Sequence, residues 1–284
     1  MYHWQIRDRI LRIAARPVVM GIVNVTPDSF SDGGRFLQTD MAIAHALELV
    51  KQGADILDIG GESTRPGSTP IPLDEELRRV LPVVQTLAQQ TRTPLSIDTS
   101  KADVAQACLA AGAHIINDVT ALSDARMIDI ARQFQAGVIL MHMQGTPQTM
   151  QQDPHYDNVV DDVARWLDER ARSVIASGVG QDTLVLDPGI GFGKRHAHNL
   201  ELLVRLPELQ RLGRPICLGA SRKGFIGKIT GRSVQEGGAG SGAVACWAMM
   251  KQAAQVLRVH DVAVTRDAVE TMAALAETKD RLLV

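Results

Sequence analysis

Short apolar runs alternate with longer segments of helical periodicity along most of the chain. The runs lie at residues 17–23, 54–59, 95–97, 114–116, 137–141, 184–186, 215–218 and 256–259. Because most positions in each run are apolar, the runs predict strands that are covered on both faces, as in a parallel sheet. Apolar residues at helical spacing predict helices over residues 41–51, 73–90, 101–111, 159–177, 200–211, 241–255 and 263–283.

Eight strands that alternate with helices, in a chain of 284 residues, are the number expected of a closed (β/α)8 barrel. The predicted fold class is therefore α/β: a (β/α)8 TIM barrel with a short N-terminal β-hairpin over residues 2–14. A doubly wound open sheet is the alternative, but no Gly-x-Gly-x-x-Gly sequence follows the first strand. No linker or repeat indicates a second domain, so residues 1–284 are predicted to form a single domain.

The composition limits the classes of partner. The net charge of -2 gives no basic face for nucleic acid, and no apolar stretch reaches the roughly 18 residues of a membrane span. Cys108, Cys217 and Cys246 lie in apolar runs without the spacing of a metal or redox motif. They predict reduced core thiols in a cytoplasmic protein. We therefore expect small-molecule substrates, with neither nucleic acid nor a membrane as partner.

Polar side chains follow all eight predicted strands. The carboxyl ends of the strands of a (β/α)8 barrel meet at one mouth, where such residues form a site. A single aspartate or asparagine after a strand is more often a turn former, but a polar residue at every strand end indicates a shared function. The residues are Asn24, Thr64, Arg65, Asp98, Asn117, His142, Asp187, Ser221, Lys223, Arg258 and His260.

The acceptors among these residues suit a flat heterocycle. Asp98, Asn117 and Asp187 offer carboxylate oxygens and one amide, which would pair with the ring N–H donors and acceptors of such a ligand. Asn24 and Asp32 add hard oxygen ligands that suit a Mg2+ ion shared with phosphate groups.

The donors suit an anion. Arg258, His260, Thr64 and Arg65 offer positive charge and hydrogen-bond donors of the kind that bind a phosphate or pyrophosphate. Residues 187–194 resemble a phosphate loop, but the glycines and the lysine have the wrong spacing for one. We interpret this segment as a glycine-rich lip beside the pocket.

Eight motifs, in this order and over nearly the whole chain, resemble those of the dihydropteroate synthases, a family of pterin-binding enzymes. They are Asn-Val-Thr-Pro-Asp-Ser-Phe-Ser-Asp-Gly-Gly at 24–34, Gly-Gly-Glu-Ser-Thr-Arg-Pro-Gly at 60–67, Asp-Thr-Ser-Lys at 98–101, Asn-Asp at 117–118, Met-His-Met-Gln-Gly at 141–145, Asp-Pro-Gly at 187–189, Ser-Arg-Lys at 221–223 and Arg-Val-His-Asp-Val at 258–262.

The resemblance implies a transferase that joins p-aminobenzoate to 6-hydroxymethyl-7,8-dihydropterin pyrophosphate, giving 7,8-dihydropteroate and pyrophosphate. It also implies Mg2+ as cofactor, a homodimer and a target of sulfonamide drugs. The residues it assigns are Asp98, Asn117, Asp187 and Lys223 to the pterin; Asn24 and Asp32 to the metal; Thr64, Arg65, Arg258 and His260 to the pyrophosphate; Ser221, Phe30, Pro66 and Phe192 to p-aminobenzoate; and Asn24, Lys223, Arg258 and His260 to catalysis.

One segment departs from the family pattern. The family carries Glu-Arg before the small residues that open the next helix, whereas here Glu236 is followed by Gly-Gly-Ala-Gly-Ser-Gly at 237–242. The glycines predict a more flexible loop around Lys223.

Two other functions stay open at this point. A methyltetrahydrofolate–corrinoid methyltransferase would share the pterin-binding residues but has no use for a pyrophosphate clamp, so the motifs at 221–223 and 258–260 count against it. A non-catalytic pterin-binding protein is suggested only by the glycine run.

Overall fold

The structure is a computed structural model that describes residues 1–26 and 35–282. Eight parallel strands form its main sheet, in the order β8-β7-β6-β5-β4-β3-β10-β9. A parallel bridge between Leu186 and Ile216 joins the two ends, so the sheet closes into the predicted barrel. The strands are β3 Val18–Asn24, β4 Ile56–Gly60, β5 Leu95–Asp98, β6 Ile115–Asp118, β7 Gly137–Met141, β8 Leu184–Asp187, β9 Cys217–Leu218 and β10 Val256–Val259.

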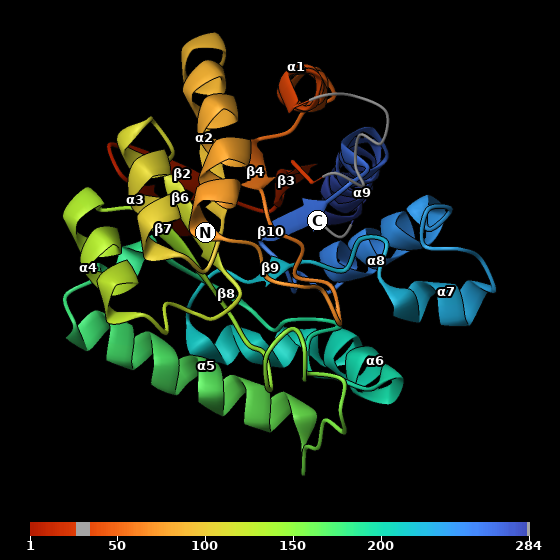
Figure 1. Cartoon of the computed structure of the whole chain (residues 1–284). Helices are drawn as coiled ribbons and strands as arrows, with labels where there is room; N and C mark the ends of the chain where they lie inside the picture. The colour runs from red at the N-terminus through yellow and green to blue at the C-terminus, as the bar shows by residue number, and fades with distance from the viewer. Residues whose placement is uncertain (27–34, 283–284) are drawn as a thin grey trace.

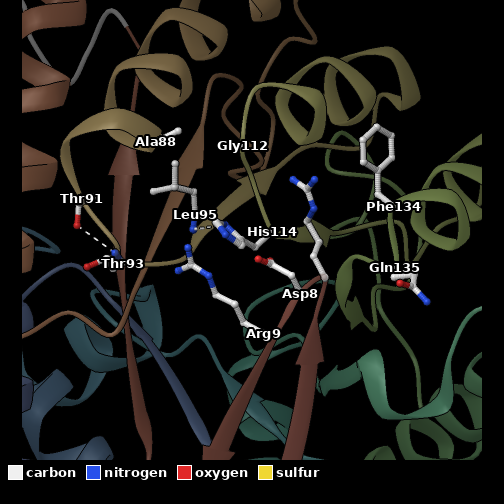
Figure 2. Close-up of a pocket in the computed structure, with 11 residues that line it drawn as sticks. Asp8, Arg9, Ala88, Thr91, Thr93, Leu95, Gly112, His114, Phe134 and Gln135 are labelled. Carbon is white, nitrogen blue, oxygen red and sulfur yellow. Dashed lines mark hydrogen bonds between the residues drawn. The ribbon is translucent and has the colours of Figure 1, made fainter.

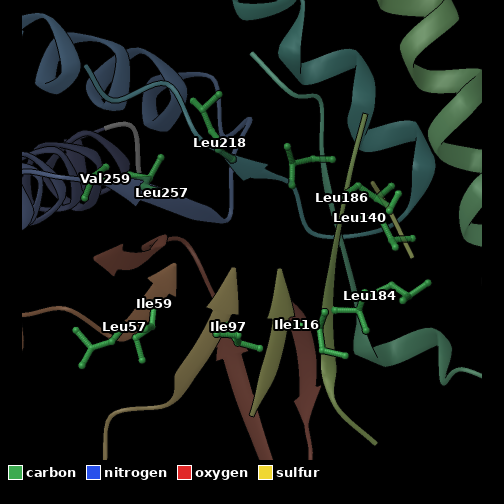
Figure 3. Packing of buried hydrophobic residues seen from close by; sticks show 14 of the residues in the cluster. Leu57, Ile59, Ile97, Ile116, Leu140, Leu184, Leu186, Leu218, Leu257 and Val259 are labelled. Atoms are coloured by element: carbon green, nitrogen blue, oxygen red, sulfur yellow. The ribbon is translucent and has the colours of Figure 1, made fainter. Parts of the chain in front are cut away.

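Helices surround the barrel (Figure 1). They are α1 Arg35–Lys51, α2 Leu73–Gln90, α3 Ala102–Ala110, α4 Ala125–Phe134, α5 Val159–Ala176, α6 His196–Val204, α7 Gly224–Thr230, α8 Gly238–Met250 and α9 Val262–Leu282, with 3-10 turns η2 Gln181–Thr183 and η3 Leu206–Leu212. The outward-facing strand residues, such as Leu57, Ile97 and Leu186, pack beneath them in one apolar cluster (Figure 3). In the described part of the chain, no helix is both long and apolar enough to cross a lipid bilayer.

The predicted hairpin is present and closes one end of the barrel. Strands β1 (Tyr2–Ile6) and β2 (Arg9–Ile13) pair antiparallel. Trp4, Ile6 and Ile13 are fully buried against the first residues of the barrel strands, and the Trp4 indole N–H donates to the carbonyl of Thr183 at 2.7 Å. Because the hairpin fills the amino-terminal end, a ligand can enter the barrel only from the carboxyl-terminal mouth.

Several helical segments differ from the sequence prediction. Helix α1 begins at Arg35 and not at residue 41. Helix α4 was not predicted, although Asp124 caps it by accepting from the Arg126 amide. Helix α7 was also not predicted. The single helix predicted over 200–211 is divided into α6 and η3, with Pro207 in the first turn of η3. The helix predicted over 241–255 ends at Met250, because Gln252 adopts a left-handed conformation with φ 51°.

Most of the glycine run is helical, whereas the sequence placed the start of this helix at residue 241. Gly238–Met250 is α8, and Ser241 accepts through its hydroxyl from the Arg222 amide at 2.9 Å. A Cβ atom at Gly240 would overlap the Ile226 side chain of α7. Glycine is therefore needed at 240 for the close packing of α7 and α8.

We expect Gly240→Ala to lower the free energy of unfolding by about 1–3 kcal/mol, because the added methyl group forces α7 and α8 apart. Gly242→Ala is the matched control in the same helix. The nearest atom to a Cβ at Gly242 is Val264 Cγ1 at 3.4 Å, an ordinary contact, and alanine favours the helix by up to about 1 kcal/mol. Urea denaturation of both variants measures the difference, and equal effects would contradict this account of the packing.

Candidate active site

Two layers of side chains fill the barrel. The lower layer is apolar and packs on the hairpin. The upper layer is polar. Its residues lie two positions further along the same strands, where the side chains again point inward. The successive residues are Ile56 and Asp58, Ile115 and Asn117, Val185 and Asp187, and Val256 and Arg258. The polar layer lies just below the open mouth.

Arg258 is bound by two carboxylates in this polar layer. Its Nε donates to Asp58 Oδ2 at 2.6 Å and its Nη2 donates to Asp98 Oδ2 at 2.5 Å. The Asn117 amide also donates to Asp58 Oδ2, at 3.1 Å. The Asp58 side chain is fully buried and that of Arg258 is 20% exposed. Buried charges of this kind are tolerated only when they are paired.

Burial changes the titration of this network. Burial, together with nearby Asp58, raises the pKa of Asp98 to about 7 against the opposing effect of Arg258. Although burial opposes its charge, Asp58 and Asp98 raise the pKa of Arg258. In the described part of the chain, Asp58 Oδ1 and Ser96 Oγ are buried and have no hydrogen-bond partner. They are therefore the polar atoms of the layer that a ligand would satisfy.

Asp187 and Lys223 form the second charged part of the mouth. Asp187 Oδ1 accepts from the Gly189 amide at 2.7 Å, and burial raises the pKa of Asp187 although Lys223 opposes the rise. Lys223 Nζ donates to the carbonyl of Ile190 and lies 4.2 Å from the centroid of the Phe192 ring. Burial lowers the pKa of Lys223 to about 8. Lys223 thus lies near the Asp187 carboxylate and against an aromatic surface.

The glycine-rich lip, residues 187–194, is held in place by Lys194 at its end. This lysine is 2% exposed. Its Nζ lies 2.9 Å from His142 Nδ1 and donates to the carbonyl of Phe192 at 2.9 Å. Burial lowers the pKa of Lys194 far below its ordinary value and that of His142 to about 2. Through these contacts Lys194 positions Phe192, whose ring lies beside Lys223.

His260 and Ser221 lie together on the other side of the mouth. Ser221 Oγ is 3.2 Å from His260 Nδ1 and accepts from the His260 amide at 3.2 Å. Burial, Arg258 and Arg222 lower the pKa of His260 to about 4. A hollow of about 530 Å3 lies at the ends of β3 and β10, beside α1 and α9. It is lined by Asn24, Arg222 and His260 together with helix residues such as His45, Leu49 and Val264.

The loop after β4 approaches this hollow. Thr64 is half-buried, whereas Arg65 and Pro66 are exposed. Arg65 lies close enough to contribute to the lowered pKa of His260. The base of the loop is fixed by Lys101, which pairs with Glu62 and, at 2.5 Å, with the buried Glu76.

The structure brings most of the predicted residues together, with one change of grouping. The sequence grouped Arg258 with the phosphate-binding residues, whereas its guanidinium group is paired with Asp58 and Asp98. The described contacts do not join Pro66 to Ser221 or Phe192, and Phe30 and Asp32 lie outside the described residues.

Asp58 is one of three buried charged residues that the sequence prediction missed. The signal was present: Asp58 is the one charged residue inside the strand Ile56–Gly60. A charge at the centre of a buried strand requires a partner, and the partner found here is Arg258. Glu76 and Lys194 were also missed. Each is buried beside a partner that is distant in the sequence, Lys101 for Glu76 and His142 for Lys194.

A closed barrel with a polar layer of acids, amides and bound cations at its carboxyl-terminal mouth defines an enzyme of the (β/α)8 class that acts on a polar small molecule. Residues 20–260 match the family described as "Pterin binding enzyme". The chain belongs to this pterin-binding family and, within it, to the dihydropteroate synthases.

Similar proteins support this assignment over nearly the whole chain. The dihydropteroate synthase of Escherichia coli (strain K12) is 44% identical over 266 residues, which cover 94% of both chains. The dihydropteroate synthase of Neisseria meningitidis serogroup C is 46% identical over 264 residues, covering 92% of this chain and 93% of that one. The structure of the Yersinia pestis enzyme with a sulfonamide drug complex superposes with a TM-score of 0.91 at 44% identity, covering 97% and 99% of the two chains.

Proposed function

We propose that this chain condenses 6-hydroxymethyl-7,8-dihydropterin pyrophosphate with p-aminobenzoate to give 7,8-dihydropteroate and pyrophosphate. The observation that carries the proposal is the buried polar layer of the barrel mouth. It joins acceptors for a flat heterocycle, Asp98, Asn117 and Asp187, to the cations of Arg258 and Lys223. Solved Xanthomonas albilineans dihydropteroate synthases hold 4-aminobenzoic acid in one structure and 7,8-dihydropteroate in another, with 49% and 46% identity to this chain.

The pterin would occupy the space above Asp58 and Asp187. Its ring N–H donors would meet the Asp187 carboxylate, which already keeps one oxygen on the Gly189 amide. Asp58 Oδ1 and Ser96 Oγ supply further polar atoms that are buried and unpartnered within the described chain. Because buried polar groups stabilise only those ligands that pair with them, this layer would select a pterin over an apolar ring.

In the reaction, the bond between the pterin methylene carbon and the pyrophosphate oxygen breaks, and its electron pair leaves with the pyrophosphate. The p-aminobenzoate nitrogen then forms the new C–N bond, and its proton passes to solvent. No protein nucleophile is needed. Arg65, Thr64 and His260 would bind the departing pyrophosphate, which is electrostatic stabilisation of developing charge. Lys223 and Phe192 would hold p-aminobenzoate beside the methylene carbon, together with Ser221.

We further propose Mg2+ as the cofactor. Within residues 1–26 and 35–282, no three His, Cys, Asp or Glu side chains gather as a protein-held metal site would require. A Mg2+ ion of this kind would be held mainly by the substrate phosphates. Asn24 at the end of β3 supplies an oxygen of the type that Mg2+ prefers, on the hollow that His260 also lines. The bound ion would neutralise the pyrophosphate charge.

The proposal includes a homodimer in the cytoplasm. On α8, Trp247 and Met250 are 37% and 66% exposed, and Val264 of the adjacent α9 is 47% exposed. Such apolar side chains on neighbouring helices suit a contact with a second copy. Cys108, Cys217 and Cys246 are free thiols, as the reducing cytoplasm favours, although Cys246 is only half-buried.

Pyrophosphate release tests the proposed reaction. We expect release only when p-aminobenzoate and the pterin pyrophosphate are both present, and its loss when a chelator removes Mg2+. A sulfonamide should inhibit competitively against p-aminobenzoate, because it has the same aryl amine opposite a polar group. Binding of the pterin without pyrophosphate release would support a non-catalytic protein, and methyl transfer from methyltetrahydrofolate would support the methyltransferase alternative. Full turnover in the chelator would remove Mg2+ from the proposal.

A further inference from the structure

A second hollow lies at the opposite end of the barrel from the mouth. It has a volume of about 570 Å3 and is lined by the hairpin turn and by the segments that lead into β5, β6 and β7 (Figure 2). We call it the amino-end hollow. None of the residues assigned to the proposed reaction lines it. The hairpin residues Arg7, Asp8 and Arg9 form one wall.

The two arginines of this wall are held in place by carbonyl groups. Arg7 Nη1 donates to the carbonyls of Leu109 at 2.8 Å and Ala113 at 2.7 Å. Arg9 Nη1 donates to the carbonyl of Arg92 at 2.6 Å. These contacts use one nitrogen of each guanidinium group and neutralise no charge. In the described part of the chain, neither arginine has a carboxylate oxygen within ion-pair distance.

His114 lies in the centre of the hollow. Figure 2 shows its ring between the Arg9 guanidinium and the Asp8 carboxylate. Its Nδ1 accepts from the Leu95 amide at 3.3 Å, so the neutral ring carries its proton on Nε2 and can donate it. Burial, Arg9 and Arg7 lower the pKa of His114 to about 4, and the opposing effect of Asp8 is smaller. The net field at the ring is therefore positive.

The rest of the hollow is suited to a compact apolar group. Ala88, Leu95 and Phe134 supply carbon surface, and the Arg7 guanidinium lies 5.6 Å from the centroid of the Phe134 ring. The Thr91 hydroxyl accepts from the Thr93 amide at 3.0 Å and keeps its own proton available as a donor. The hollow thus has hydrogen-bond donors and positive charge, from the two arginines and His114, together with an apolar wall.

We propose that the amino-end hollow is a second binding site, for a small organic oxyanion that carries a phosphate or carboxylate group on a compact apolar body. Arg7 and Arg9 would bind the oxyanion through the guanidinium nitrogens that their carbonyl contacts leave unused, and the His114 Nε2–H would add a third donor. Arginines at the ends of α2 and α3 would also stabilise the last carbonyl groups of these helices, but that role does not require the half-buried imidazole that lies beside them.

His114 provides the measurement. Phenyl phosphate and benzoate are the probes, phenol is the neutral control, and the histidine rings are labelled for NMR. An anion beside the ring should raise the pKa of His114 by about 1, because opposite charge favours the protonated form. We expect a saturable change at His114 with phenyl phosphate or benzoate and none with phenol. The probe that changes the pKa of His114 more shows whether the site prefers a phosphate or a carboxylate group. A response confined to His260, at the mouth, would overturn the proposal.

Four variants localise the binding. Arg9→Gln and Arg7→Gln should each weaken the preferred probe at His114 by about tenfold, the loss of one charge-assisted contact. Asp8→Asn should strengthen it, because Asp8 is exposed and is the one acid of the wall. Arg12→Gln is the matched control, since Arg12 is an exposed arginine on the same strand that does not line the hollow. Equal weakening by Arg12→Gln and Arg9→Gln would show that only the net charge matters and would refute a built site. Pyrophosphate release should be unchanged in all four.

Discussion

Arg258→Ala should lower kcat/KM by about three orders of magnitude and the free energy of unfolding by about 3–5 kcal/mol. The stability loss follows because the substitution leaves Asp58 and Asp98 buried without their cation, and breaking one side of a buried pair costs this much. The activity loss corresponds to about 4 kcal/mol of transition-state stabilisation. Urea denaturation and steady-state pyrophosphate release measure the two effects separately.

The binding of two ligands distinguishes the role of Arg258. The sequence motif suggested that the guanidinium group binds the pyrophosphate, in which case the variant would lose the pterin pyrophosphate and keep the bare pterin alcohol. The structure places the group on Asp98, inside the polar layer. We therefore expect calorimetry to show comparable losses for both ligands. Selective loss of the pyrophosphate ligand would mean that Arg258 leaves the carboxylates to bind phosphate.

A double variant separates stability from function. In Asp58→Asn with Arg258→Ala, one of the two unpaired carboxylates becomes a neutral amide of the same size. Part of the lost stability should return, because fewer charges remain buried alone. Activity should not return with it, since the guanidinium group is still absent. Parallel recovery of both would show that Arg258 acts on activity only by keeping the barrel folded.

The barrel itself could be predicted from local pattern. The eight apolar runs, each with polar residues at its carboxyl end, predict where the barrel strands lie along the chain. Each of the eight observed barrel strands overlaps one of these runs. Helix α2 was predicted over the residues that it occupies, because a helical apolar stripe and an acidic first turn agree. The local signal was weaker at η3, where Pro207 interrupts the pattern, whereas α4 was missed although Asp124 caps it.

The pairing of side chains across the barrel could not be predicted in the same way. Asp58 and Arg258 are separated by 200 positions in the sequence, and nothing local to either residue identifies the other. The register that brings them together depends on closure of the sheet, with Arg258 beside Met20 and Ile22 beside Asp58. The same holds for Lys194, whose partner His142 belongs to the end of β7. Strand ends predict which residues share the mouth, but not which of them contact one another.

Asp187→Asn should reduce the affinity for the pterin alcohol by about 100-fold while the fold remains intact. The asparagine can still accept from the Gly189 amide through its one oxygen. Its NH2 group then faces the N–H donors of the pterin, so two donors meet where an acceptor is required, and each unsatisfied buried group costs roughly 1–3 kcal/mol. Calorimetry with the pterin alcohol measures the loss and circular dichroism checks the fold. Asp129→Asn, an exposed change on α4, is the control and should alter neither.

The Asp187→Asn variant should also change the pKa of Lys223, which tests whether the two residues belong to the same pterin pocket. Asp187 is the group that most opposes the effect of burial on Lys223, whose pKa is about 8. Without that carboxylate, we expect the pKa of Lys223 to fall further, so that Lys223 loses its charge at a lower pH. The losses in Asp187→Asn and Lys223→Met should then be smaller in the double variant than their sum, because the two groups act as one unit. Unchanged affinity in Asp187→Asn would place the pterin elsewhere, and strict additivity would separate Lys223 from the pterin pocket.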